Sequence, residues 1–111
     1  MELRIMMVVE EFRKKLIDLG FDKVYVLKRE PSCVIYIGIF QNRELIIAIS
    51  RGTTSLYAKI FLADAILSSH LQCNYIKYFP IGLYVFSDNV NDLAKRLINK
   101  ALKIIRLQKT S

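Results

Sequence analysis

The sequence predicts an α/β domain in the order α-β-β-β-α-β-β-α, with a mixed sheet and helices on both of its faces. Two observations lead to this prediction. Apolar residues recur at helical spacing near both ends of the chain, and short β-branched runs separated by turn residues lie between them. With 111 residues the chain has room for one core, so residues 1–111 are expected to form a single domain.

The first helix is expected over about residues 4–19. Its apolar positions recur three or four residues apart, and charged residues occupy the opposite face. Gly20 follows, in the position where a glycine commonly ends a helix. The apolar positions are Ile5, Val8, Val9, Phe12, Leu16 and Leu19.

Three strands are expected next, over Val24–Arg29, Cys33–Phe40 and Leu45–Ser50. Pro31 marks the turn after the first strand because proline cannot continue a strand ladder. Gln41-Asn42-Arg43 forms the polar tip of a hairpin between the second and third strands. These two strands are apolar without alternation, which predicts that they are buried on both faces at the centre of the sheet.

A second helix is expected over Thr54–Leu71. It is apolar most of the way round, so we expect it to be sandwiched inside the fold or to form a subunit interface. Two short strands should follow, over Tyr75–Phe79 and Leu83–Phe86. Asn89 can then cap a closing helix that carries an apolar stripe. The six tyrosines are expected to serve packing.

Composition excludes several classes of protein. Hydrophobic residues make up 53% of the chain, which excludes a disordered protein, and the single histidine excludes a multi-histidine zinc site. Two cysteines exclude a disulfide scaffold and a cysteine-cluster metal site. Cys33 and Cys73 lie within or beside apolar runs and are interpreted as small buried hydrophobes. No uncharged stretch reaches the ~20 residues of a membrane span, and the N-terminal apolar run is too short for a signal peptide. A cytoplasmic location is therefore expected, with no membrane partner.

The charge of the chain is uneven. Seventeen basic residues against ten acidic ones give a net charge of +7, and no acid occurs between Leu93 and Ser111. A cluster of one sign attracts a polyanion, because each neutralised phosphate releases counterions. The alternative interpretation is a solvated helix face that aids solubility. The basic residues of this segment are Lys95, Arg96, Lys100, Lys103, Arg106 and Lys109.

The order of elements resembles the restriction-endonuclease-like core, and the chain is most similar to archaeal Holliday junction resolvases of the Hjc type. The similarity covers most of the chain. Glu10–Phe21 resembles the first helix of the family, Ser32–Gly52 resembles its catalytic hairpin, and Asp88–Ile105 resembles its closing helix. The resemblance implies a small basic protein that acts on branched DNA as a dimer.

The chain departs from this family in its chemistry. The resemblance implies a divalent metal held by a carboxylate of the first helix, an aspartate of the second strand and a Glu-x-Lys of the third. The corresponding positions here are Val9, Cys33, Ala48 and Ser50, none of which is acidic. We therefore expect a nuclease fold without its active site: no catalytic residues, no metal or other cofactor, and no enzyme activity.

These observations together predict a protein that binds nucleic acid, DNA rather than RNA, by charge and shape. It is expected to act as a homodimer or as the subunit of a heteromer. Phosphate contacts carry no sequence information, so no base specificity is expected. The residues expected to contact nucleic acid are Arg51, Lys59, Lys95, Arg96, Lys100, Lys103 and Arg106.

Two alternatives remain open. The first is an inert structural subunit of a tRNA-splicing endonuclease, a family of similar core whose strand-three histidine would be replaced here by Ala48. That core closes with a strand and not with a basic helix. The second is a roadblock-like dimerisation module that does not bind nucleic acid. Such modules have two strands before their middle helix, whereas three are expected here.

Overall fold

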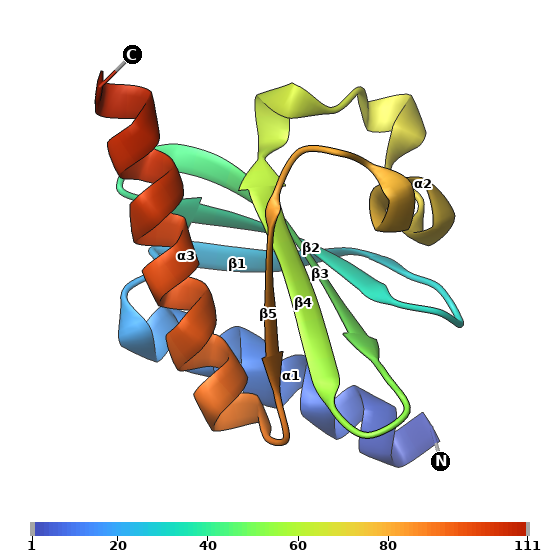
Figure 1. Cartoon of the computed structure of the whole chain (residues 1–111). Helices are drawn as coiled ribbons and strands as arrows, with labels where there is room; N and C mark the ends of the chain where they lie inside the picture. Colours follow the sequence, from blue (N-terminus) through green and yellow to red (C-terminus); the bar gives the residue numbers. More distant parts are fainter. Residues whose placement is uncertain (1, 111) are drawn as a thin grey trace.

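The computed structural model describes the backbone of residues 2–110 and the side chains of residues 8–107. It contains a five-stranded sheet with α1 and α3 on one face, while the segment between β4 and β5 crosses part of the other face (Figure 1). The elements are α1 (Glu2–Leu19), β1 (Lys23–Arg29), β2 (Val34–Phe40), β3 (Arg43–Arg51), β4 (Leu56–Leu62), α2 (Cys73–Tyr78), β5 (Leu83–Ser87) and α3 (Val90–Thr110). Two short 3-10 turns, Ala63–Ala65 and Ser68–His70, precede α2.

The α/β class is confirmed, and so are the elements whose ends carry local signals. Gly20 follows α1 with a φ of 137°, a conformation that favours glycine. Gln41 and Asn42 have φ values of 50° and 64°, as a tight two-residue hairpin between β2 and β3 requires. Asn89 caps α3, because its Oδ1 accepts a hydrogen bond from the Asp92 N–H at 2.8 Å.

The helix predicted over Thr54–Leu71 is wrong. Residues Leu56–Leu62 form β4, which lies between β3 and β5 and pairs with both. The strand is apolar on both faces because Ile60 packs in the core under the helices while Phe61 packs on the opposite face. Periodicity alone does not separate a strand buried on both faces from a buried helix. The strand predicted over Tyr75–Phe79 is likewise wrong, since Cys73–Tyr78 is the short helix α2.

The expected mixed sheet is also corrected. All four pairings are antiparallel, and the strands follow one another in the order β1-β2-β3-β4-β5. The observed element order is α-β-β-β-β-α-β-α. Because residues 56–62 are a strand, no crossover helix separates β3 from β4. Helices do lie on both faces, but α1 and α3 share one face and six-residue α2 lies on the other.

The main core lies between the sheet and the two long helices. Phe12 and Leu16 of α1, Leu97 of α3 and Ile47 of β3 are all 0% exposed. Burying one such side chain stabilises the fold by about 1.5–3 kcal/mol. Tyr36 is equally buried, and its hydroxyl donates a hydrogen bond to the Val9 carbonyl oxygen at 3.0 Å. Burial raises the pKa of Tyr36 well above its usual value.

Residues 63–79, which we call the covering segment, form a smaller core with the opposite face of the sheet. Ile35, Ile46, Phe61 and Ile76 are its most buried aliphatic and aromatic members. The segment lies over β2, β3 and the end of β4 and leaves the outer half of β4 and β5 uncovered (Figure 1). It therefore divides this face into a closed half and an open half.

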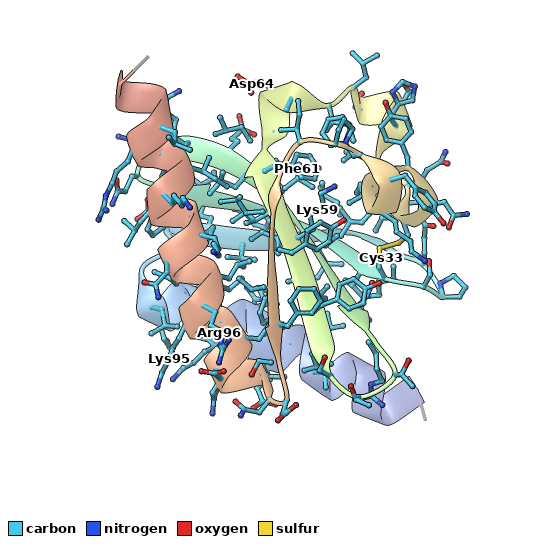
Figure 2. All side chains as sticks on the ribbon, viewed as in Figure 1. Cys33, Lys59, Phe61, Asp64, Lys95 and Arg96 are labelled. Carbon is cyan, nitrogen blue, oxygen red and sulfur yellow. A yellow bond between two sulfur atoms is a disulfide. The ribbon has the colours of Figure 1, made fainter. Side chains whose placement is uncertain are left out.

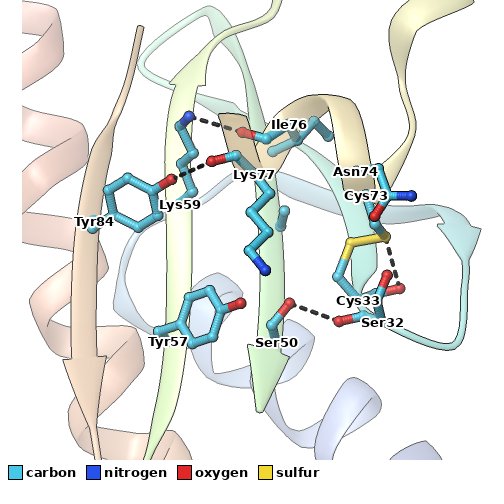
Figure 3. Close-up of a pocket in the computed structure, with 11 residues that line it drawn as sticks. Ser32, Cys33, Ser50, Tyr57, Lys59, Cys73, Asn74, Ile76, Lys77 and Tyr84 are labelled. Atoms are coloured by element: carbon cyan, nitrogen blue, oxygen red, sulfur yellow. Dashed lines mark hydrogen bonds between the residues drawn. A yellow bond between two sulfur atoms is a disulfide. The ribbon is translucent and has the colours of Figure 1, made fainter. Parts of the chain in front are cut away.

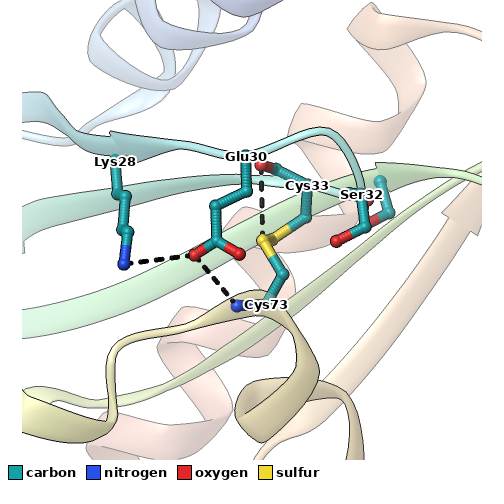
Figure 4. Close-up of a disulfide and its surroundings, with 6 residues drawn as sticks. Lys28, Glu30, Ser32, Cys33 and Cys73 are labelled. Carbon is teal, nitrogen blue, oxygen red and sulfur yellow. Dashed lines mark hydrogen bonds and ion pairs between the residues drawn. A yellow bond between two sulfur atoms is a disulfide. The ribbon is translucent and has the colours of Figure 1, made fainter.

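A disulfide between Cys33 and Cys73 fixes the covering segment to the start of β2, with the two Cα atoms 5.8 Å apart (Figure 4). Both cysteines are buried, as expected, but their interpretation as unbonded hydrophobes is wrong. Glu30 supports the same junction: its Oε2 accepts the Cys73 N–H at 3.3 Å and lies 3.4 Å from Lys28 Nζ. The pairing joins residues 40 apart in the chain, a contact that no local pattern indicates.

Candidate nucleic-acid interface

Three aromatic rings project from the open half of the sheet. Tyr84 and Phe86 are alternate residues of β5, so both point away from α3, while Val85 between them points into the core. Tyr57 lies opposite Phe86 on β4. We call these three rings, Tyr57, Tyr84 and Phe86, the aromatic platform. It is the part of this face that the covering segment leaves uncovered.

The rings of the platform contact one another and form a continuous surface. The centroids of Tyr57 and Phe86 are 5.9 Å apart, and those of Tyr84 and Phe86 are 6.3 Å apart with an interplanar angle of 17°. The Tyr84 hydroxyl donates a hydrogen bond to the Lys77 carbonyl oxygen at 3.0 Å, which fixes its ring against α2 (Figure 3). The platform is therefore held in place before any ligand arrives.

Lys59 lies beside Tyr84 on the same face of the sheet, covered by α2, and not on the surface where it was expected. It is 3% exposed, and its Nζ donates hydrogen bonds to the carbonyl oxygens of Ile76, at 2.9 Å, and of Phe79. The ammonium also lies 5.1 Å from the centroid of the Tyr84 ring. Burial lowers the pKa of Lys59. These carbonyls end α2, so Lys59 acts as a C-terminal cap of that helix and is removed from the expected phosphate contacts.

The positions compared with nuclease ligands do lie close together. Cys33, Ala48 and Ser50 line a cavity of about 90 Å³ between α2 and the sheet (Figure 3). Ser50 Oγ donates a hydrogen bond to the Ser32 carbonyl oxygen at 2.9 Å. Lys77 extends from α2 across this face toward Tyr57. None of the described residues that line the cavity is acidic, and its polar groups are hydroxyls, an amide and lysine amines.

Val9 lies on α1, and Arg51 is the last residue of β3. They border a neighbouring hollow of about 160 Å³ together with Cys33, Ser50 and Glu30. Glu30 already holds the backbone of Cys73, and Val9 is buried in the main core. Arg51 is exposed at this end of β3, and it does not line the hollows that touch Phe86. Arg51 thus borders a hollow with Asn91 at the start of α3, but it lies outside the hollow that Arg96 and Lys100 share with the platform.

The remaining expected residues lie on α3, where they form its basic face: Lys95, Arg96, Lys100, Lys103 and Arg106. Lys100 is half-buried and the other four are exposed. Figure 2 labels Lys95 and Arg96 in the first half of α3, and Arg96 lies on the side of the helix that borders β5. Arg96 Nε donates to Asp92 Oδ2 at 2.7 Å, and hydrogen bonds from Ser87 and Arg96 lower the pKa of Asp92.

The basic face and the aromatic platform are continuous. Arg96, Asn99 and Lys100 of α3 line one shallow hollow together with Tyr84 and Phe86 of β5. This continuity arises because β5 is the edge strand and leads through a two-residue turn directly into α3. Basic side chains of α3 and aromatic side chains of β5 therefore share one surface.

The platform was missed by sequence reasoning, which assigned the tyrosines to packing. Tyr36 does pack, but Tyr84 is 39% exposed and Phe86 is 55% exposed. The available signal was the spacing of Tyr84 and Phe86 in a predicted strand, which places both rings on one face. The sequence did not show that this face is open.

No family model, no curated protein and no solved structure matches the chain. Within the part of the chain that the structure describes, none of the helices has the length and apolar character needed to cross a membrane.

Proposed function

We propose that this protein binds DNA without cleaving it, through the basic face of α3. The observation that carries the proposal is the run of five basic residues between Lys95 and Arg106, with no acid after Asp92 to offset them. Four of the five are exposed and spread over three turns of a helix that packs its opposite side on the sheet. A positively charged surface on a rigid helix matches the regularly spaced negative charges of a phosphate backbone.

Binding without cleavage is supported by the residues at the positions compared with nuclease ligands. Cys33, Ala48 and Ser50 share a cavity whose described lining has no carboxylate, whereas Mg²⁺ prefers carboxylate and water oxygens. Within this proposal, the nuclease-like resemblance suggests which DNA to examine. A four-way junction belongs among the ligands because the resemblance is to junction resolvases. A homodimer or a heteromeric partner and a cytoplasmic location remain predictions.

The proposal is tested by the salt dependence of binding to a four-way junction and to a linear duplex. Replacing Lys95, Lys100 and Lys103 together by Gln should weaken binding and reduce the slope of log K against log salt by about 2.7, at roughly 0.9 per phosphate contact. The matched control replaces Lys14, Lys23 and Arg43, which are exposed bases on α1, β1 and the hairpin. It removes the same charge and should leave most of the slope unchanged.

An equal reduction of affinity and of salt slope in both triple variants would show that net charge, and not the position of the charges on α3, drives binding. That result would contradict the proposal. Adding magnesium last tests cleavage in the same samples. Cut junctions would contradict the expectation that the chain is inert.

A further inference from the structure

We infer that the aromatic platform binds unpaired bases of single-stranded DNA, with Arg96 and Lys100 beside it neutralising the phosphates. The inference rests on the proposed DNA binding and names the form of DNA that this surface fits. It starts from Phe86, which is 55% exposed on an ordered strand and makes its ring contacts with the two other platform residues. A lone exposed ring is ordinary, but three rings in contact on one open face form a patch.

The form of the patch matches stacked bases. In a strand pair, alternate residues of one strand and the opposed residue of its neighbour lie on one face, so the three rings are spread over the sheet surface. Tyr84 and Phe86 are nearly parallel, so successive bases of a flexible strand can stack on both. Bases in a duplex are already stacked and expose only their edges, so the platform fits unpaired bases.

The platform is also preorganised. Tyr84 is fixed by its hydrogen bond to the Lys77 carbonyl oxygen, and the ammonium of its cross-strand neighbour Lys59 lies 5.1 Å from its ring centroid. Tyr57 packs against Phe86. Little side-chain freedom remains to be lost when a base binds, which favours affinity.

Charge favours a polyanion over a second copy of this chain as the occupant. Arg96 and Lys100 line the same hollow as Tyr84 and Phe86, and Lys77 lies at the opposite border. Two copies placed face to face would bring these cations together. Asp88 and Asp92 lie near Phe86 in a hollow at the turn before α3, where Asp92 is paired with Arg96. The acids are thus confined to one end of the surface.

The test compares a labelled oligothymidine of about 20 residues with an abasic oligomer of the same length and charge, using fluorescence anisotropy. The native protein should bind oligothymidine more tightly, because stacking on a ring changes affinity by about five- to 150-fold per base. Phe86→Leu and Tyr84→Leu should each reduce oligothymidine affinity by a factor in this range. Both should leave the affinity for the abasic oligomer, and for duplex, nearly unchanged.

Tyr25→Leu is the matched control. Tyr25 is 52% exposed on β1, at the opposite edge of the sheet, and its replacement should have no effect on oligothymidine binding. Far-ultraviolet circular dichroism and thermal unfolding confirm that each variant is folded, since exposed positions tolerate leucine.

Each outcome has a separate meaning. Equal binding of oligothymidine and the abasic oligomer, with duplex binding intact, would overturn the platform and leave the α3 proposal standing. Absence of all DNA binding would overturn both. Tighter binding of oligouridine than of oligothymidine would overturn the choice of DNA. A dimer that dissociates in Phe86→Leu, measured by light scattering without DNA, would overturn the platform as a free surface.

Discussion

The two faces of the sheet are built from the same strands but are closed in different ways. On one face α1 and α3 cover the strands, and the side chains between them reach 0% exposure at positions such as Phe12, Ile47 and Leu97. On the other face the covering segment closes half, is fixed there by a disulfide, and leaves aromatic rings exposed. The closed face accounts for stability, whereas the half-open face is where the structure has surface available for a ligand.

The largest difference between the two faces is expected when one residue is truncated on each. Leu97→Ala removes a fully buried side chain of α3 and should lower the free energy of unfolding by about 2–5 kcal/mol. Phe86→Leu changes an exposed ring and should alter it by less than about 0.5 kcal/mol. Urea unfolding measures both. Similar losses in the two variants would show that the platform serves packing and not binding.

The disulfide tests whether the covering segment depends on its covalent link. Replacing Cys33 and Cys73 together by Ser should lower the free energy of unfolding by about 4 kcal/mol, the chain-entropy value for a loop of this length. Reducing the disulfide in the native protein should lower its free energy of unfolding by a similar amount. Amide exchange should rise first in residues 63–79 and least in α1 and α3. Uniform exchange over both faces would contradict a division of the sheet into two cores.

A smaller effect is expected at Lys59, which stabilises the covering segment from below. Lys59→Met keeps the apolar stem but leaves the carbonyl oxygens of Ile76 and Phe79 without their donor. This should lower the free energy of unfolding by about 1–3 kcal/mol. The matched control is Lys77→Met, which replaces an exposed lysine of α2, the helix that Lys59 caps, and should change stability little. An equal change in the two variants would contradict the capping role.

The same lysine gives a pH dependence of known sign. Its pKa is lowered in the folded chain by burial, so the unfolded chain binds more protons between the folded and unfolded pKa values. The contribution of Lys59 to stability should therefore increase as the pH rises from below its folded pKa toward 10.5, its ordinary value. Lys59→Met should lack this increase. A native profile parallel to that of the variant would show that burial does not perturb this amine.

Much of the fold could be predicted where a local signal exists. Gly20, the hairpin tip at residues 41–43 and the Asn89 cap were all indicated by residue type, because each fixes a backbone conformation within a few residues. The segment 54–71 could not be assigned in this way. The β4 part of it, residues 56–62, is buried by α3 on one face and by the covering segment on the other, and such apolar runs fit a helix or a strand equally.

The part of the candidate site that has a local signal in the sequence could also be predicted. The basic face of α3 is visible in the sequence because an apolar stripe and a basic remainder share one helix. The platform is exposed because the covering segment, residues 63–79, lies elsewhere on this face. The Cys33–Cys73 disulfide fixes that position, which the sequence does not reveal. Lys59 shows the converse, since it was expected at the surface of a predicted helix but lies on strand β4 and is buried by the covering segment.

Under the proposal, one continuous surface, the platform together with the basic face of α3, binds DNA. Titration of isotope-labelled protein with oligothymidine, followed by backbone amide chemical shifts, tests it most directly. The largest shifts should fall in β5, at Tyr57 and on the outer side of α3, with little change at Tyr25 on β1. Shifts that cluster on β1 or α1, or no saturable shifts at low salt, would contradict it.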